Sequence, residues 1–178
     1  VALARYAAEA CFELGNPRGA RDWLRGALDK AQGGRERAAV LNNLGVAFSE
    51  LDLAGDAENA FLTSIQEAPS ATAIANRGKV LLETGQIGRA IQWLGDWWEK
   101  PEFRAREIGG TLATALSLAM RNDDALRLAT ELEARADADD RIFGLISALQ
   151  GDGAGDYAAA VLHALAGLER WPESTVLK

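Results

Sequence analysis

Residues 41–69 read LNNLGVAFSELDLAGDAENAFLTSIQEAP, and this stretch decides the fold. Its apolar residues recur every three to four positions on either side of a break at 51–55, which predicts two short amphipathic helices. The alanine at position 57 recurs along the chain: Ala20, Ala57, Ala90, Ala125 and Ala160 lie 37, 33, 35 and 35 residues apart. A pair of short helices with this period cannot bury its own apolar faces. The sequence therefore predicts a solenoid of stacked helix pairs.

Glycine and proline residues divide the rest of the chain in the same way. Asn16 is expected to cap a helix that begins at Pro17, and Gly33 with Gly34 is expected to end it. Ser70 is expected to cap the helix that follows Pro69. The expected helices cover about 2–14, 17–32, 36–50, 56–68, 71–84, 87–99, 102–120, 123–136, 140–150 and 156–170. The loop 151–155 is expected to be an inter-helix turn with a short insertion. We expect one domain over 1–178, with repeats at about 1–34, 36–70, 71–101, 102–137 and 139–172, and residues 173–178 starting a cap or a further helix.

The residues at the packing positions resemble the tetratricopeptide repeat (TPR), a helix-turn-helix of 34 residues. The second repeat matches best, through Leu41, Leu44, Gly45, Phe48, Ala57, Phe61 and Pro69. The third repeat has Gly78, Leu81, Gly85, Ala90 and Leu94, whereas the fourth keeps only Ala113, Leu116 and Ala125 and has Gly109 and Gly110 inside its first helix. The resemblance implies an all-α, right-handed superhelical solenoid of stacked helix-turn-helix repeats. It also implies that the first helix of each repeat lines a concave groove.

Charge and composition narrow the classes of function. The net charge of −7 argues against a nucleic-acid partner, because phosphate binding needs a basic surface. No apolar run approaches the roughly 18 residues that cross a bilayer, so no membrane insertion is expected. Cys11 is the only cysteine, which excludes an internal disulfide and leaves the compartment open, with a cytoplasmic location favoured. Because the chain begins at Val1 and not at methionine, we expect it to be processed or part of a longer protein.

No constellation in the sequence predicts catalysis. His163 is the only histidine, and it occupies the helix column of Trp23 and Trp93, where a packing role is expected. Ser147 and Ser174 lie in no motif that would activate a nucleophile. The acidic residues near helix ends are expected to offset the helix dipole and not to bind metal. We therefore expect no cofactor, no metal and no enzymatic activity.

The candidate binding residues lie on the predicted groove. Asn43 and Asn76 occupy the same place in consecutive first helices, although asparagine is a poor residue for a helix interior. In related solenoids an asparagine at this place bonds the backbone of a bound peptide through its carboxamide. Arg5, Asn42 and Lys79 are expected on the same surface, where they would add donors and charge. The alternative is a solvated or helix-bridging polar face, and the sequence does not decide between the two.

The carboxylate clamp of the TPR family, which binds acidic chaperone tails, is not reproduced. Arg5 and Asn43 fit its pattern, but Glu9 stands where an asparagine is expected. Thr72 and Asn76 replace two basic groups. Binding of such tails is therefore not expected.

Trp97 and Trp98 form a second candidate surface. Trp97 occupies the column that holds Ala27, Ser64, Leu132 and Gly167 in the other repeats, where a small residue is usual. A large ring there is expected to pack in the core, and to widen the spacing between helices or displace the next repeat. The alternative is an exposed aromatic hot spot that contacts a partner.

These observations predict a noncatalytic protein-protein interaction scaffold. It would bind a peptide or helical segment of a partner protein in its concave groove, where rigid stacked helices supply preorganisation. The alternative is a regulatory or assembly module of a larger enzyme or of a secretion or assembly machine. Self-association is compatible with both hypotheses.

Overall fold

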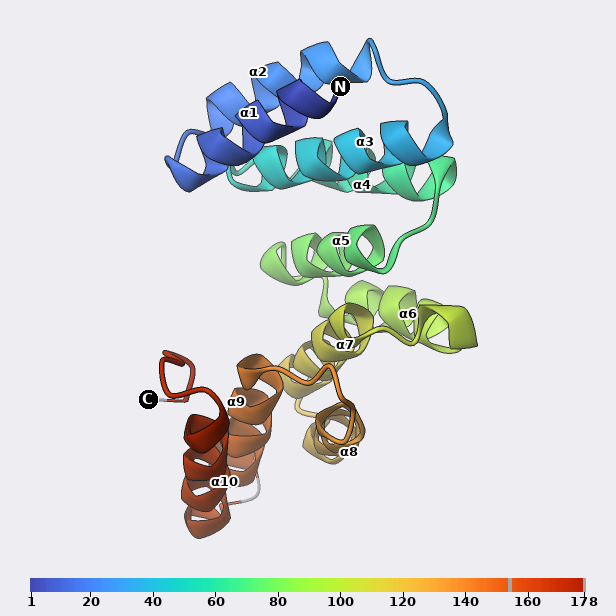
Figure 1. Ribbon diagram of the computed structural model, residues 1–178. Coiled ribbons are helices and arrows are strands. Elements are labelled where there is room, and N and C mark those ends of the chain that lie inside the picture. Colours follow the sequence, from blue (N-terminus) through green and yellow to red (C-terminus); the bar gives the residue numbers. More distant parts are fainter. Residues whose placement is uncertain (154, 178) are drawn as a thin grey trace. The chain divides into compact units, whose positions relative to one another are not determined.

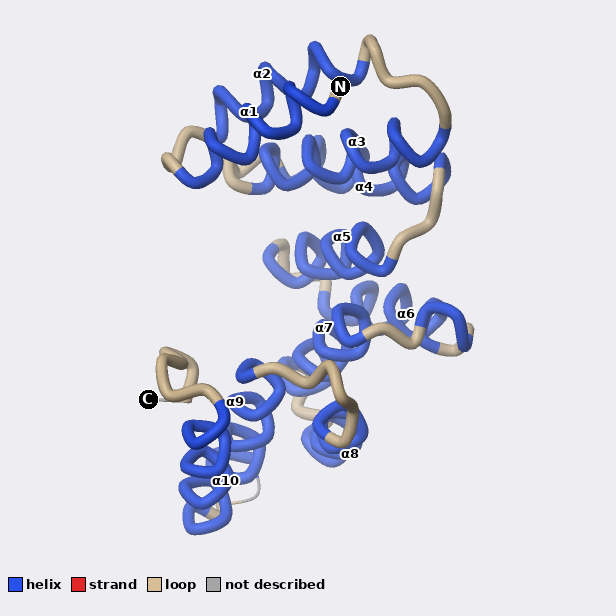
Figure 2. The backbone as a smooth tube through the Cα atoms, in the orientation of Figure 1, coloured by secondary structure: helices blue, strands red, loops and turns tan. Residues whose placement is uncertain are grey.

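The chain is built from helices alone. The computed structural model describes residues 1–153 and 155–177, in which ten α-helices and two short helices are joined by turns and no strand forms (Figure 2). The bounds are α1 (Ala2–Glu13), α2 (Pro17–Leu28), α3 (Gly34–Ser49), α4 (Ala54–Glu67), α5 (Ala71–Glu83), α6 (Ile87–Trp98), α7 (Arg106–Leu118), α8 (Asn122–Glu133), α9 (Asp140–Ala148) and α10 (Tyr157–Arg170), with a 3-10 helix η1 (Pro101–Phe103) and a π-helix η2 (Leu149–Gly153). The all-α prediction is confirmed.

The helices fall into two compact units. The first unit covers Val1–Gln86 with α1 to α5, and the second begins at Ile87 with α6 (Figure 1). Within each unit, helices that are consecutive in the chain pack against one another. The division lies between the two helices of the third predicted repeat, where the sequence indicated a single domain.

A left-handed backbone turn separates the two helices of every repeat. The residues in this conformation are Gly15, Asp52, Gly85, Met120 and Gly155, with φ between 58° and 72°. They follow the same intervals as the five alanines, 37, 33, 35 and 35 residues. In the second repeat the Leu53 amide donates to the Phe48 carbonyl at 2.9 Å, which closes the helix end in the manner of a Schellman motif. The left-handed turn therefore recurs with the period of the repeat. Three of its five positions are glycine, which adopts this conformation without steric cost.

Side-chain caps begin several helices where the sequence predicts them. The Asn16 side chain accepts a bond from the Gly19 amide at 3.0 Å, with Pro17 as the first helical residue. Ser70 caps α5 in the same way by accepting from the Ala73 amide at 3.2 Å. Each cap satisfies an amide that the helix leaves without a partner.

Small residues let the paired helices approach closely. A Cβ atom on Gly45 of α3 would lie 2.6 Å from the Phe61 ring of α4, closer than real contacts allow. In the second unit a Cβ on Gly109 of α7 would lie 2.8 Å from the Trp98 ring. Phe61 is fully buried, which contributes roughly 2 to 3 kcal/mol. Glycine in these first helices therefore makes room for a large ring of a neighbouring helix.

Two helix ends differ from the prediction by four residues, and Gly34, which was expected to end the second helix, is the first residue of α3. The helix α2 ends at Leu28 and not near Gln32, because the Gln32 amide donates instead to the Glu36 carboxylate at 2.9 Å. The helix α7 begins at Arg106 and not at 102, because Pro101–Phe103 form the separate turn η1. Both differences lengthen a link between repeats.

Residues 171–177 form turns and not a helix. Ser174 donates to the Asp140 carboxylate at 2.8 Å, and Leu177 is buried beside Gly167 and Phe143. This segment therefore covers part of α9 and α10. Ala154 and Lys178, which the sequence places in the 151–155 loop and the terminal segment, lie outside the described residues.

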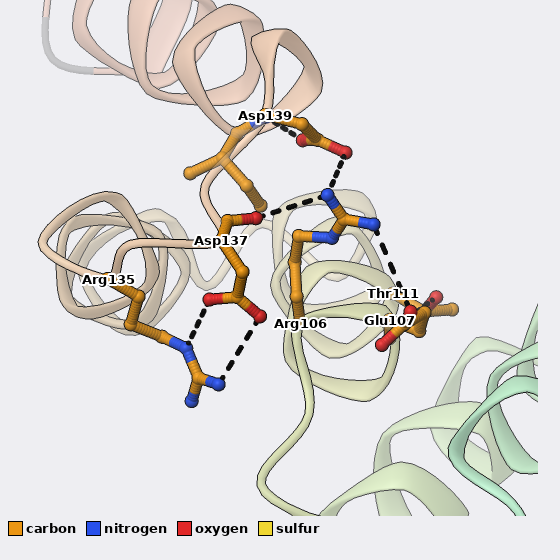
Figure 3. A network of polar contacts seen from close by, with 7 residues as sticks. Arg106, Glu107, Thr111, Arg135, Asp137 and Asp139 are labelled. Carbon is orange, nitrogen blue, oxygen red and sulfur yellow. Dashed lines mark hydrogen bonds and ion pairs between the residues drawn. The ribbon is translucent and has the colours of Figure 1, made fainter.

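Arginine side chains hold the link between α8 and α9 in place (Figure 3). Arg106 donates to the Asp137 carbonyl at 3.1 Å and pairs with the Asp139 carboxylate at 3.2 Å. Arg135 donates to the Asp137 carboxylate at 2.9 Å and to the Arg104 carbonyl at 2.8 Å. The hydrogen bonds from Arg135 lower the pKa of the Asp137 carboxyl below its ordinary value. The start of α7 and the end of α8 are thus tied to one loop.

Candidate functional site

Two hollows on the first unit contain most of the predicted groove residues. Each has a volume of about 380 Å³. The α1–α3 hollow is lined by Ala2, Arg5, Tyr6, Glu9, Phe12, Asn43 and Val46. The α3–α5 hollow is lined by Arg5, Arg35, Ala38, Ala39, Asn42, Asn43, Ala68, Pro69, Ser70 and Thr72. Arg5 and Asn43 line both, so the two hollows are neighbours along α3.

The repeat explains why these residues meet. The turn positions place Tyr6, Asn43 and Asn76 at one position of consecutive first helices. Because side chains at one repeat position form a column across stacked helices, Tyr6 and Asn43 line the same hollow. The sequence already contained this information about Tyr6. Ala20 and Ala57 are 37 residues apart, and the same interval leads from Tyr6 to Asn43.

Three asparagines form a short hydrogen-bonded chain between α3 and α5. The Asn76 Nδ2 donates to the Asn42 Oδ1 at 3.2 Å, and the Asn42 Nδ2 donates to the Asn43 Oδ1 at 3.3 Å. All three side chains are half-buried. Among the described residues, neither the Asn43 Nδ2 nor the Asn76 Oδ1 bonds another side chain or backbone group. The chain of amides thus keeps one donor group and one acceptor for an external partner.

The α3–α5 hollow is positively charged. Arg5 of α1 and Arg35 of α3 both line it, and both are exposed. Neither forms an ion pair with another described residue. Glu9 lines only the α1–α3 hollow, one helical turn after Arg5 on the same helix. An anionic or carbonyl group of a ligand is therefore favoured beside Arg5 and Arg35.

Not every predicted residue joins these hollows. Lys79 is exposed and lines neither, although it shares the repeat position of Glu9 and Val46. Arg35 does line the second hollow, yet its place in the first turn of a helix carried no repeated signal in the sequence.

The two tryptophans of the second candidate surface have different environments. Trp98 is buried with 9% of its surface exposed, and its ring packs on Gly109. Trp97 is half-buried and packs edge-on against Phe103 at 4.7 Å between ring centroids, while the Lys100 ammonium lies 3.6 Å from its ring centroid. The burial of Trp98 leaves Trp97 as the only member of the pair with substantial exposed surface.

His163 packs as the sequence predicts. Its ring stacks on Phe143 with centroids 4.9 Å apart, and its Nε2 lies 3.6 Å from the Glu133 carboxylate. Within the described ranges, no three His, Cys, Asp or Glu side chains are grouped so that they could hold a metal ion. No helix in the part of the chain that the structure describes is long and apolar enough to cross a membrane.

Comparison with known proteins identifies the fold. The sequence matches no protein-family model and no curated protein. Its structure is similar to TTC0263, a TPR protein of Thermus thermophilus, with a TM-score of 0.80 and 16% identity over 98% of this chain and 93% of the other. It is also similar to MamA of Desulfovibrio magneticus RS-1, with a TM-score of 0.68 and 18% identity over 97% of this chain and 96% of the other.

A third similar structure is YrrB, described as a TPR protein with an unusual peptide-binding site. Its TM-score is 0.62, with 14% identity over 96% of this chain and 86% of that one. The class of protein is therefore an all-helical repeat protein. More specifically, the chain has the TPR fold, as its packing residues predicted.

Proposed function

We propose that this chain is a noncatalytic protein-interaction scaffold that binds an extended peptide of a partner protein along α1, α3 and α5. The observation that carries the proposal is the asparagine chain. Asn43 keeps an unused amide donor and Asn76 an unused acceptor, which is the pair of groups that a peptide backbone complements. The peptide-binding site named for YrrB, which shares the fold, adds support.

The surroundings favour an extended segment over a compact ligand. The two hollows are neighbours that share Arg5 and Asn43, so a chain could occupy both in succession. Arg5 and Arg35 would hold a carbonyl or carboxylate, and the aromatic ring of Tyr6 would pack on an apolar side chain. Helices that are already stacked lose little further entropy when a ligand binds.

The test begins with a peptide selected on the wild-type chain from a displayed random library. Its affinity is then measured by fluorescence anisotropy for the variant Asn43→Ala with Asn76→Ala. Two lost polar contacts at about 1 kcal/mol each predict at least tenfold weaker binding. Loss of the two half-buried bonds to Asn42 should lower the free energy of unfolding by only about 1 to 2 kcal/mol, and circular dichroism verifies that the variant is folded. Asn59→Ala is the matched control, because Asn59 lies exposed on α4 away from both hollows. Normal binding by the double variant would exclude this groove as the site.

A second candidate function is a module that assembles with other domains of a larger enzyme or machine. The exposed face of α1 favours it, because Leu3 is 79% exposed while Val40, at the same position of α3, is fully buried. At the equivalent position of α3 this face packs against neighbouring helices. A Leu3→Glu substitution would then weaken assembly with the partner domain and leave peptide affinity unchanged.

A further inference from the structure

The outward column of α10 differs from that of every other second helix. In α2, α4, α6 and α8 the three outward positions are polar or glycine, and all are exposed: Arg18, Asp22, Gly26; Gly55, Asn59, Thr63; Gly88, Gln92, Asp96; and Asp123, Arg127, Glu131. In α10 the same positions hold Ala158, Leu162 and Ala166, and these are exposed too. An apolar column thus replaces a polar one in this helix alone among the five.

A second apolar column lies beside it. Tyr157, Val161 and Leu165 are 65%, 58% and 54% exposed, and Leu162 of the outward column is 69% exposed. From Tyr157 to Leu168 the helix has no Asp, Glu, Lys or Arg. Contiguous exposed apolar surface of this kind usually marks an interaction site.

A further stacked repeat would not cover the whole surface. The counterparts of Val161 and Leu165 in α6 are Ile91 and Gly95, which lie beside α7 of the next repeat. The counterparts of Leu162 are exposed even in the repeats that are followed by another one. A repeat stacked on α10 would therefore bury the Val161 column and leave Leu162 in water. Only a partner that packs on the outward column of α10 would bury Leu162.

The charges at the two ends of α10 indicate which partner would cover this surface. Asp156 precedes the helix and Arg170 lies in its last turn, and both are exposed. An antiparallel copy of the same helix would place each Asp156 near the Arg170 of the other copy, with Leu162 facing Leu165 across the two-fold axis. The alanines at 158 and 166 would let the backbones approach closely.

We propose that α10 is a self-association surface, on which α10 of a second copy of this chain packs antiparallel through Leu162 and Leu165. The contact is isologous, so it closes at a dimer, and it uses no residue of the groove in the first unit. It goes beyond the peptide-binding function, because neither depends on the other.

The first experiment is sedimentation of the whole chain over a range of concentrations. We expect a monomer–dimer equilibrium that Leu162→Glu weakens at least tenfold, since two buried carboxylates would face apolar side chains. Leu118→Glu is the matched control, because Leu118 is a similarly exposed leucine on α7, and it should leave dimerisation unchanged. A monomer at all concentrations, or a dimer that Leu162→Glu does not weaken, would overturn the proposal. Circular dichroism verifies that each variant is folded.

The second experiment tests the antiparallel geometry by disulfide cross-linking in a Cys11→Ala background. Leu162→Cys lies near the proposed axis, where the two Cα atoms come within the roughly 4.4 to 6.8 Å that a disulfide spans. Ala158→Cys lies about 11 residues of helix from its mate, roughly 16 Å along the axis, which is too far. We expect a covalent dimer for Leu162→Cys only. Equal cross-linking of both variants, as in a parallel pair, or of neither, as on a surface that takes a different protein, would refute the proposal.

Discussion

The same repeat position is polar and accessible in the first unit and closed in the second. Asn43 and Asn76 are half-buried and bond through Asn42, whereas Thr111 and Ile146 at the equivalent places are 8% and 2% exposed. The Thr111 hydroxyl donates to the Glu107 carbonyl of its own helix at 2.8 Å. It therefore offers no donor to a ligand. The column that could bind a peptide in α3 and α5 is packed in α7 and α9.

This difference shows that a shared fold does not distribute function evenly along a repeat array. The close packing is common to both units, since Gly45 and Gly109 each make room for a ring. The first unit keeps unused polar groups on its first helices, and the second unit has four large exposed apolar side chains together on α10. Binding and self-association would thus use different faces of different helices.

Exchanging the side chains of this column should lower the stability far more in the second unit than in the first. Ile146→Asn is expected to destabilise the chain by about 3 to 5 kcal/mol, because it removes buried methyl groups and leaves an amide without partners. Asn43→Ile should cost less than about 1 kcal/mol, because position 43 is half-exposed. Urea unfolding followed by circular dichroism measures both.

Ile146→Val is the control for this pair, with an expected loss of about 0.5 to 1.5 kcal/mol. If Ile146→Asn were tolerated as well as Asn43→Ile, the column would be open in both units. The inference that this column is accessible in the first unit and closed in the second would then be wrong.

The glycines test whether the close packing is shared. Gly45→Ala and Gly109→Ala should each destabilise by about 1 to 2 kcal/mol, since overpacking outweighs the gain in helix propensity. Gly26→Ala on α2 meets no atom within 4 Å and should instead stabilise by roughly 0.5 to 1 kcal/mol. A gain in unfolding midpoint for Gly45→Ala or Gly109→Ala would show that the unit concerned is packed more loosely.

Periodicity and turn residues predicted the helices well, because the repeat imposes the same local signals five times. Asn16 and Ser70 cap where expected, and all ten α-helices lie within a few residues of their predicted bounds. The bond from Asn76 to Asn42 could not be predicted, because a diagonal contact depends on the offset between stacked helices.

The groove was predicted only in part, because some of its residues meet through contacts that the repeat pattern does not encode. Arg35 approaches the hollow because the 68–70 link between α4 and α5 lies beside the start of α3. No repeat position encodes that link. The burial of Trp98 likewise depends on a glycine in the next repeat, at position 109, which the sequence alone marked only as a departure from the pattern.

The smallest expected effect concerns the turn that both units share. Met120 of the second unit and Asp52 of the first adopt φ of 59° and 58°, where the other three repeats have glycine. A Cβ in this conformation costs roughly 1 to 2 kcal/mol, whereas glycine adds some backbone entropy to the unfolded chain. Met120 is 81% exposed, so its side chain contributes little packing. Met120→Gly should therefore stabilise by about 0.5 to 1 kcal/mol, measured as a higher urea midpoint.

Asp52→Gly should gain less, because aspartate adopts the left-handed region more readily than methionine does. Ala119→Gly serves as the control, since Ala119 has φ of −83° and glycine there only adds unfolded-state entropy, so its midpoint should fall. If Met120→Gly lowered the midpoint as Ala119→Gly does, the turn of the second unit would carry no strain. The two units would then differ in their turns as well as in their grooves.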